Sequence, residues 1–256
     1  MSRGSAVPRA LLALGLVLAL LAGVGVFVMQ SEVAAPLVPP PGAAPEVSEL
    51  LNATLWVQTS AEYVASAEQA YRLARIMLDR ALEDSSWTAT IEQAAEGGYE
   101  SLPPAVILDV DETVLDNSPY QARQILDRFE FGTATWHDWV REAKARPVPG
   151  ALDFTRYAAE RGVAVYYVTN RRAEVEEPTR QNLERLGFPF IEGVDTLLTR
   201  DEREDWGSDK SSRRRVVGSI HRIVLLLGDN FGDFVSGIDT SVAERAELAA
   251  QHAEHW

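Results

Sequence analysis

Three short apolar segments alternate with longer segments that have a helical pattern. Residues 105–110, apart from Asp109, and residues 163–168 and 223–227 are continuous apolar runs rich in β-branched side chains, which is typical of strands buried on both faces. A shorter run at 196–199 predicts a fourth strand. Strands that alternate with helices predict an α/β fold, with a parallel sheet flanked by helices on both faces.

The helical segments follow from apolar spacing and good helix formers. A long helix is expected over 48–83, and further helices over 151–161, 174–186, 210–217 and 241–255. The expected buried positions of the long helix are Leu51, Leu55, Tyr63, Ala67, Ala70, Ala74 and Met77.

Two local sequences predict where helices begin. Ser118 is expected to be an N-cap, with Pro119 at the first helical position and Gln121 closing a capping box. Thr135 is expected to cap a short helix that ends at Lys144.

The N-terminus has the pattern of an exported or membrane-anchored chain. Arg3 and Arg9 precede an apolar stretch at 10–28, which as a helix would span roughly 28 Å, close to the hydrocarbon thickness of a bilayer. The basic flank predicts a cytoplasmic N-terminus and a domain outside. Both a cleaved signal peptide and an uncleaved signal anchor fit this pattern. We favour the anchor, because Pro36 directly follows the candidate cleavage site at 33–35.

The chain therefore divides into three expected parts. Residues 1–30 form the signal peptide or signal anchor, and 31–47 form a Pro- and Ala-rich linker that is stiff and extended. Residues 48–256 are long enough for one catalytic domain.

Charge and composition exclude several classes of function. The formal net charge is -14, and an acidic body of this kind repels nucleic-acid polymers. The one basic run, Arg213–Arg215, is expected to be a solvated helix face rather than a phosphate clamp. No cysteine is present, which excludes disulfides, thiolate metal sites and cysteine nucleophiles. Small phosphorylated molecules remain possible substrates, because a metal ion and one lysine can dominate a local field.

Polar and charged side chains stand where the three long strands end. Ligands of parallel sheets bind beyond these carboxyl ends, so the side chains are expected to share one pocket. Residues two apart in an extended segment point the same way, so Asp109 and Asp111 can face that pocket together. The candidate site residues are Asp109, Asp111, Thr169, Asn170, Arg171, Asp229 and Asp233, with Lys210 shortly before the third strand.

The carboxylates among these candidates predict a metal site. Four carboxylates in one pocket cannot all stay ionised without compensation. A hard divalent cation with oxygen ligands provides it, and magnesium is the usual choice beside phosphates. Lys210 supplies a further positive charge.

Four segments of the chain resemble the motifs of a known enzyme family. They are Trp56–Tyr63, Leu108–Tyr120, Val168–Arg171 and Gly228–Asp233. Together they resemble the class C (lipoprotein-type) acid phosphatases and 5'-nucleotidases of the haloacid dehalogenase (HAD) superfamily. The resemblance covers about residues 48–238 and implies a Rossmann-like core with a small helical cap. Trp136, Trp139 and Tyr120 are candidates for packing within a cap or for stacking on a nucleobase.

The resemblance implies a role for each candidate residue. Asp109 would attack phosphorus and form an aspartyl-phosphate, while Asp111 would protonate the leaving oxygen and then activate water. Phosphoryl oxygens would be bound by Thr169 and Lys210, and substrate by Asn170 and Arg171. The expected Mg²⁺ ligands are the carboxylates of Asp109 and Asp229 and the backbone carbonyl of Asp111, with Asp233 orienting metal-bound water or Lys210.

Two departures from the family pattern affect these expectations. The family usually begins its mature chain with a lipidated cysteine, which a membrane helix or plain secretion must replace here. The family also continues past the position of Trp256 with another strand and an aromatic-containing Pro-Asn segment near the substrate pocket. We therefore expect that the sequence is truncated at its C-terminal end or that this wall of the pocket is missing.

The function expected from the resemblance is a magnesium-dependent acid phosphatase outside the cytoplasm. It would hydrolyse phosphomonoesters, with nucleoside 5'-monophosphates as candidate substrates. Two alternatives stay open. The same site could pass its phosphoryl group to an alcohol, as a phosphotransferase does, or the domain could be a cell-surface binding protein without turnover.

Overall fold

The computed structural model describes residues 48–252. These residues belong to the compact unit Ser48–Trp256. The predicted membrane helix and the Pro- and Ala-rich linker lie outside the described residues. Within 48–252, no helix combines the length and the apolar character needed to cross a bilayer.

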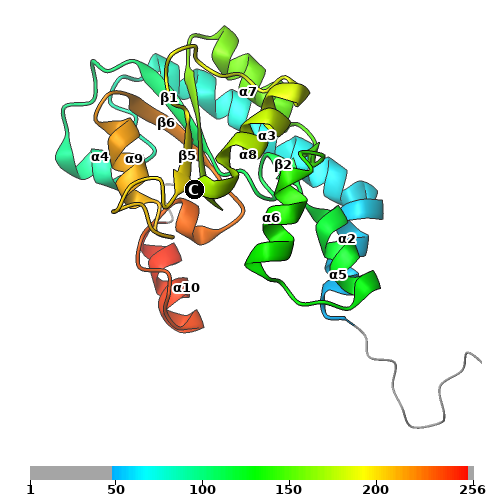
Figure 1. Cartoon of the computed structure of the whole chain (residues 1–256). Coiled ribbons are helices and arrows are strands. Elements are labelled where there is room, and N and C mark those ends of the chain that lie inside the picture. The colour runs from blue at the N-terminus through cyan, green and yellow to red at the C-terminus, as the bar shows by residue number, and fades with distance from the viewer. Residues whose placement is uncertain (1–47, 253–256) are drawn as a thin grey trace, which may run out of the picture. The chain divides into compact units, whose positions relative to one another are not determined.

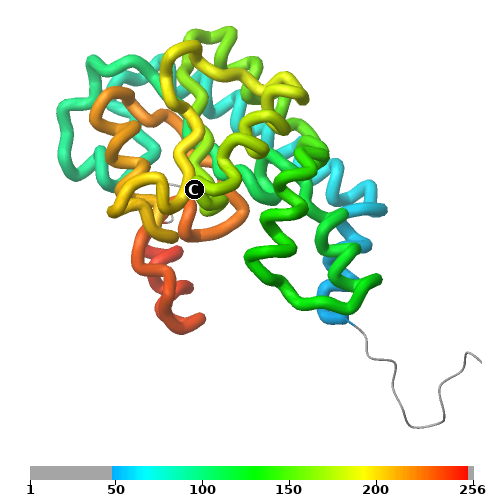
Figure 2. The backbone as a smooth tube through the Cα atoms, viewed as in Figure 1, coloured from blue at the N-terminus to red at the C-terminus, as the bar shows by residue number. Residues whose placement is uncertain are grey.

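A four-stranded parallel sheet forms the centre of the domain (Figure 1). Its strands are β1 (Pro104–Leu108), β4 (Ala164–Arg172), β5 (Leu197–Arg200) and β6 (Arg222–Leu227). Their order is β5-β4-β1-β6, so the first strand in the chain lies in the middle. The predicted α/β fold with a parallel sheet is confirmed. More than a hundred residues separate β6 from β1 along the chain, yet the two strands lie side by side (Figure 2).

The continuous apolar runs are explained by burial of the sheet on both faces. In β1, Val106 and Leu108 belong to one core cluster, and Ala105 and Ile107 belong to the other. Each cluster contains alternate residues of the neighbouring strands as well, because successive side chains of a strand point to opposite faces.

Helices cover both faces of the sheet. On one side lie α3 (Ala61–Glu83), α7 (Ala151–Glu160) and α8 (Glu176–Leu186), which contribute Tyr71, Leu78, Phe154 and Leu183 to the core with Val106 and Leu108. On the other side α9 (Ser211–Gly218) places Val217 against Ala105 and Ile107, and α4 (Ile91–Glu96) packs beside α9.

The expected single helix over 48–83 is wrong in one respect, because the structure has two helices. α2 (Leu50–Thr59) ends at Ser60, whose hydroxyl accepts a hydrogen bond from the Tyr63 backbone N–H at 3.1 Å and so caps α3. The break changes which positions are buried. Leu55 is 47% exposed and Ala70 is exposed, whereas the unpredicted Tyr71 and Leu78 are buried.

Beside the sheet, α2 packs against α5 (Ser118–Asp127), and α6 (Thr133–Arg141) packs against α8 (Figure 1). A short antiparallel pair, β2 (Leu115–Asp116) and β3 (Arg146–Pro147), brackets α5 and α6 in the chain. We refer to α5 and α6 with this strand pair as the cap lobe. The Tyr120 and Trp136 rings meet edge to face within it, with centroids 5.2 Å apart.

Both predicted helix caps in this lobe are wrong. Ser118 is the first residue of α5 rather than its cap; its backbone N–H donates to the Asp116 carboxylate at 2.9 Å, and its buried hydroxyl has no partner in the described chain. Thr135 lies inside α6, where its hydroxyl donates to the Gly132 carbonyl at 3.0 Å. The Asp116 carboxylate thus accepts a backbone N–H at the start of α5, whereas no side chain caps the start of α6.

The remaining elements lie at the ends of strands. One short 3-10 turn, η1 (Ala173–Val175), leads from β4 into α8, and another, η2 (Phe231–Asp233), follows β6. The last described helix, α10 (Val242–Gln251), has no buried residue and projects from the end of the domain (Figure 2).

Candidate active site

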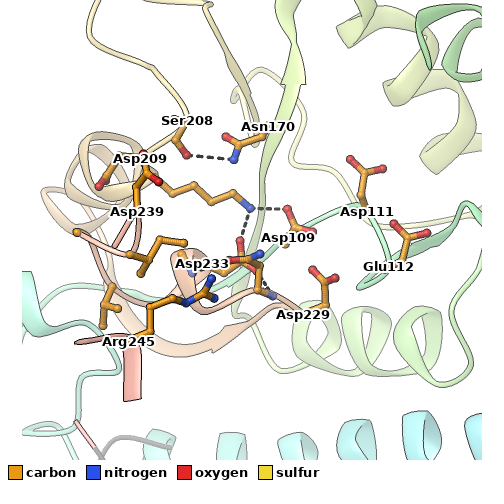
Figure 3. Close-up of a pocket in the computed structure, with 16 residues that line it drawn as sticks. Asp109, Asp111, Glu112, Asn170, Ser208, Asp209, Asp229, Asp233, Asp239 and Arg245 are labelled. Atoms are coloured by element: carbon orange, nitrogen blue, oxygen red, sulfur yellow. Dashed lines mark hydrogen bonds and ion pairs between the residues drawn. The ribbon is translucent and has the colours of Figure 1, made fainter. Parts of the chain in front are cut away.

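A cleft of about 640 Å³ lies at the carboxyl edge of the sheet. The carboxyl end of β4, the segments after β1 and β6 and the segment before α9 all reach it (Figure 3). Six of the eight predicted residues line this cleft: Asp109, Asp111, Asn170, Lys210, Asp229 and Asp233. The other two, Thr169 and Arg171, are buried next to it.

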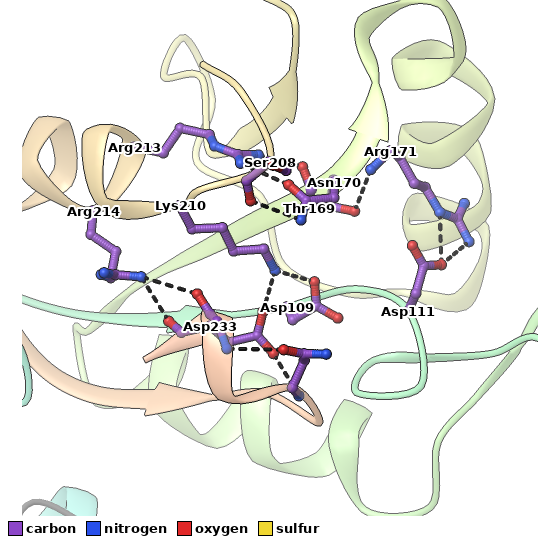
Figure 4. A network of polar contacts seen from close by, with 12 residues as sticks. Asp109, Asp111, Thr169, Asn170, Arg171, Ser208, Lys210, Arg213, Arg214 and Asp233 are labelled. Atoms are coloured by element: carbon purple, nitrogen blue, oxygen red, sulfur yellow. Dashed lines mark hydrogen bonds and ion pairs between the residues drawn. The ribbon is translucent and has the colours of Figure 1, made fainter. Parts of the chain in front are cut away.

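Asp109 is held in a buried ion cluster. Its backbone N–H donates to the Leu227 carbonyl at 2.9 Å, which ties the end of β1 to the end of β6. The Lys210 ammonium donates to the Asp109 carboxylate and also to Asp233, the latter at 2.6 Å (Figure 4). All three side chains are less than a tenth exposed, so these ion pairs are little screened by solvent.

Burial and crowding shift the proton affinities of these groups. Burial raises the pKa of Asp109 to about 7; Lys210 opposes this increase, and Asp233 and Asp111 add to it. Burial alone would lower the pKa of Lys210, but the carboxylates of Asp109 and Asp233 outweigh this effect and raise the pKa above its ordinary value. The cluster therefore holds more negative charge than one lysine balances.

Three carboxylates of the cluster can hold a cation. One oxygen each of Asp109, Asp229 and Asp233 lie within 4.8 Å of one another. Burial, followed by the charge of Asp233, raises the pKa of Asp229. Hard oxygen donors with excess negative charge fit a divalent cation such as Mg²⁺. The carboxylate of Asp111 is outside this group.

The backbone after β6 is shaped around Asp233. A Cβ added to Gly228 would meet the Asp233 carboxylate at 2.2 Å and its Cβ at 2.5 Å, so only glycine allows this approach. The Asn230 backbone N–H donates to the same carboxylate at 2.9 Å, and Arg214 donates to the Asp233 carbonyl at 3.1 Å. Asp233 is thus fixed from both sides.

Asp111 faces the cleft from the other side of Asp109 (Figure 3). Its Oδ1 accepts hydrogen bonds from Arg171 Nε at 3.0 Å and Nη2 at 2.8 Å, and from Asn117 Nδ2 at 2.9 Å. The Arg171 side chain is 1% exposed. Arg171, predicted as a substrate ligand, therefore contacts Asp111 rather than the cleft.

The end of β4 is tied to the Lys210 segment by Arg213. Its guanidinium donates to the Thr169 carbonyl at 2.5 Å, to the Asn170 side chain at 2.8 Å and to the Gly207 carbonyl at 2.8 Å (Figure 4). Asn170 lines the cleft, and its amide nitrogen donates to the Ser208 carbonyl at 3.0 Å.

The basic run at 213–215 is therefore not the solvated face that the sequence predicted. Arg213 and Arg214 are fully buried, and Arg214 forms an ion pair with Glu92 at 2.6 Å. Of the three arginines, only Arg215 is exposed. Buried carbonyls at the strand ends need donors, and the long arginine side chains provide them.

Glu112 and Asn117 are among the residues at the site that were not predicted from the sequence. Glu112 lines the cleft at a backbone φ of 60°, and burial raises its pKa to about 8. Asn117 is buried and donates to both Asp111 and Glu112. Their only sequence signal was their place in the segment that follows β1.

Comparison with known proteins identifies relatives. A family model described as HAD superfamily, subfamily IIIB (Acid phosphatase), matches residues 26–251. A crystal structure of the class C acid phosphatase from Bacillus anthracis with tungstate bound is similar at a TM-score of 0.68 and 36% sequence identity, covering 80% of this chain and 79% of that chain.

Two curated plant proteins match over a shorter stretch. A stem 31 kDa glycoprotein from Glycine max is 26% identical over 133 residues, and acid phosphatase 1 from Solanum lycopersicum is 28% identical over 130 residues. Each match covers 50% of this chain and 51% of the relative, so the chain spans about half the length of the curated relatives it matches.

Proposed function

The chain belongs to subfamily IIIB of the HAD superfamily, a group of acid phosphatases and so of phosphoric monoester hydrolases, and from this premise we propose that it hydrolyses small phosphomonoesters through an aspartyl-phosphate on Asp109. The observation that carries the proposal is the contact of Lys210 with Asp109 and Asp233 in a cleft that Asp111 also lines. This arrangement offers a nucleophile, a cation and a proton donor to one phosphoryl group.

In the first proposed step, an Asp109 oxygen attacks phosphorus and the bond from phosphorus to the leaving oxygen breaks. Asp111 gives its proton to that oxygen, which departs as an alcohol. Lys210 offsets negative charge on the phosphoryl oxygens in the transition state. The Thr169 hydroxyl is fully buried beside the cleft and is proposed to contact the phosphoryl group only after a local adjustment.

In the second proposed step, water attacks the phosphorus of the aspartyl-phosphate. Its proton passes to the Asp111 carboxylate, and the bond from phosphorus to Asp109 breaks. Inorganic phosphate leaves, and both aspartates return to their starting states. The two steps together consume one phosphomonoester and one water and release one alcohol and one phosphate.

A divalent metal is typical of HAD phosphatases, and we propose Mg²⁺ as the metal of this chain. The carboxylates of Asp109 and Asp229 would hold it with the Asp111 backbone carbonyl, and Asp233 lies close enough to orient the site. When bound, the metal would neutralise phosphate charge and reduce repulsion between phosphate and the Asp109 nucleophile. The charge excess of the carboxylate cluster supports this assignment.

The proposed substrates are small phosphomonoesters, including nucleoside 5'-monophosphates. The open cleft at the strand ends and the acidic character of the chain favour a small anion bound through a metal over a polymeric one. The tungstate in the Bacillus anthracis enzyme is a tetrahedral oxyanion like phosphate. An extracytoplasmic location follows from the basic and apolar pattern of the first thirty residues and is part of the proposal.

Phosphate release tests the proposal. Residues 31–256 would be purified and assayed with p-nitrophenyl phosphate and with a nucleoside 5'-monophosphate, with Mg²⁺ present or chelated. We expect turnover that requires both the metal and Asp109, and its loss in Asp109→Asn. Turnover unaffected by Asp109→Asn would contradict the proposal, and a phosphoester formed from an added alcohol would favour the phosphotransferase alternative.

A further inference from the structure

The two oxygens of Asp111 have very different surroundings. Oδ1 accepts three hydrogen bonds, two from Arg171 and one from Asn117. Oδ2 accepts none within the described part of the chain, and Asp111 lines the cleft (Figure 4). The three donors are guanidinium and amide N–H groups, which cannot accept a proton from a carboxyl group. A proton on Asp111 must therefore sit on Oδ2.

Arg171 is itself held in place through its remaining guanidinium nitrogen, Nη1. Its Nη1 donates to the Thr179 hydroxyl at 3.1 Å, and that hydroxyl donates to the Val175 carbonyl at 2.8 Å. The guanidinium is therefore anchored to α8 as well as to Asp111. Because its planar fork fits one carboxylate oxygen with two N–H groups, it fixes both the position and the rotation of the Asp111 side chain.

Asn117 is oriented by the cap lobe. Trp139 of α6 donates its indole N–H to the Asn117 side-chain oxygen at 2.8 Å, and Arg171 Nη2 donates to the same oxygen at 3.3 Å. Since an indole nitrogen can only donate, it settles which end of the amide is the oxygen. The amide nitrogen then has to face Asp111 and Glu112, as observed.

We propose that Arg171 is a positioning residue, assisted by Asn117 and Trp139, which holds Asp111 so that Oδ2 alone transfers the proton in both steps. This inference rests on the proposed function. It changes the role that the sequence predicted for Arg171, from a substrate ligand to a group that acts through Asp111. The positive guanidinium also offsets the charge left on Asp111 once the leaving oxygen has taken its proton.

The leaving group provides a test that a purely structural role would not pass. p-Nitrophenolate departs without a proton, whereas the alkoxide from glycerol 2-phosphate needs one. The comparison uses kcat/KM, because this quantity includes the first step, in which the leaving group departs. General acid catalysis contributes about a hundredfold or more. We therefore expect Arg171→Lys to lower kcat/KM for glycerol 2-phosphate about tenfold more than for p-nitrophenyl phosphate.

Three further variants complete the experiment. Trp139→Phe keeps an aromatic ring but removes the indole N–H, so it should show the same selective loss at smaller size. Arg161→Lys changes an arginine that forms an ion pair with Asp79, outside the cleft, and should affect both substrates equally. In an Asp111→Asn background, Arg171→Lys should have no further selective effect, because the group it positions is already inactive.

Equal losses on the two substrates would overturn the positioning role, since loss of phosphate binding lowers kcat/KM for both. A selective loss that persists in the Asp111→Asn background would overturn it as well. Circular dichroism checks that each variant folds. If Arg171→Lys does not fold, the selective loss is tested with Trp139→Phe instead. Wild-type protein without turnover on either substrate would instead contradict the proposed function itself.

Discussion

Lys210 is the cation that contacts both Asp109 and Asp233. Its ammonium is nearly enclosed, so forming the ion pairs costs desolvation free energy. The close geometry of the pairs offsets that cost. The residue was a candidate in the sequence because it precedes the third long strand. The resemblance left open whether Asp233 orients metal-bound water or Lys210; in the structure Asp233 contacts Lys210, and this contact depends on the turn after β6.

Lys210→Met should abolish most activity and weaken the fold. Loss of one positive group at a developing charge lowers kcat by about a hundredfold to a thousandfold. Removing one partner of a buried ion pair costs about 3–5 kcal/mol. Steady-state kinetics and urea denaturation measure the two effects. A variant with wild-type kcat would contradict the role of Lys210.

Gly228→Ala should displace Asp233. The added Cβ would lie 2.2 Å from the Asp233 carboxylate, so the carboxylate has to move away from Lys210. We expect activity to fall at least about tenfold, since a displacement of about 1 Å can cost a hundredfold in rate. Gly207→Ala is the matched control, because a Cβ there meets nothing within 4 Å. Equal activity of the two variants would count against this placement of Asp233.

At the scale of elements, α9 organises the site through its buried arginines. Arg213 binds the end of β4, and Arg214 binds the backbone that follows β6. The sequence predicted this helix correctly, but not the burial of its basic face. An arginine run looks the same in the sequence whether its N–H groups donate to solvent or to backbone carbonyls. Which of the two occurs depends on the strand ends that lie beside the helix in the folded domain.

Arg214→Met should destabilise the domain by leaving Glu92 buried without its partner. The side chains of Arg214 and Glu92 are 1% and 8% exposed, and breaking such a pair costs about 3–5 kcal/mol. The double variant Arg214→Met/Glu92→Gln should recover part of the loss, because the unpaired charge is gone. Urea denaturation of the wild type, of the single variants Arg214→Met and Glu92→Gln and of the double variant measures these losses. Additive losses would show that the ion pair contributes nothing beyond the two separate side chains.

The break between α2 and α3 shows why periodicity alone misplaced the buried face. Good helix formers continue through residues 48–83, so the pattern predicts one helix. The Ser60 hydroxyl ends α2 and begins α3, and the second helix then buries Tyr71 and Leu78 instead of Ala70. A serine in a helical pattern does not by itself indicate which of these outcomes occurs.

At the scale of the whole described domain, the sheet order determines where the chemistry lies. The apolar runs predicted the strands, and the polar residues that follow them predicted which edge would be functional. β1 lies between β4 and β6, so it brings Asp109 next to residues from both neighbours. The link from the cap lobe to Asp111 through Trp139 and Asn117 could not be predicted, because it joins segments that pack together only in the folded domain.

Metal binding should stabilise the folded domain. The three carboxylates lie together in the folded domain but are dispersed in the unfolded chain. The folded domain therefore binds a divalent cation more tightly. At a concentration a hundred times the dissociation constant, the gain is about 2.7 kcal/mol. Thermal denaturation with and without Mg²⁺ should therefore show a rise in Tm that Asp229→Asn reduces. Asp127→Asn, which changes an exposed carboxylate on α5, should keep the full rise.

An equal rise in Tm for wild type and Asp229→Asn would place the cation elsewhere. No rise at all in the wild type at millimolar Mg²⁺ would contradict the assignment of a magnesium site to this cluster.

Trapping the covalent intermediate tests the central claim most directly. Borohydride reduces an acyl phosphate to an alcohol, so an aspartyl-phosphate at residue 109 would become homoserine. The protein would be mixed with substrate and Mg²⁺, reduced, digested and examined by mass spectrometry of the peptide that contains residue 109, with Asp109→Asn as the control. We predict homoserine at position 109 in the wild type, only when substrate is present. Phosphate release under the same conditions without any modified Asp109 would contradict the account.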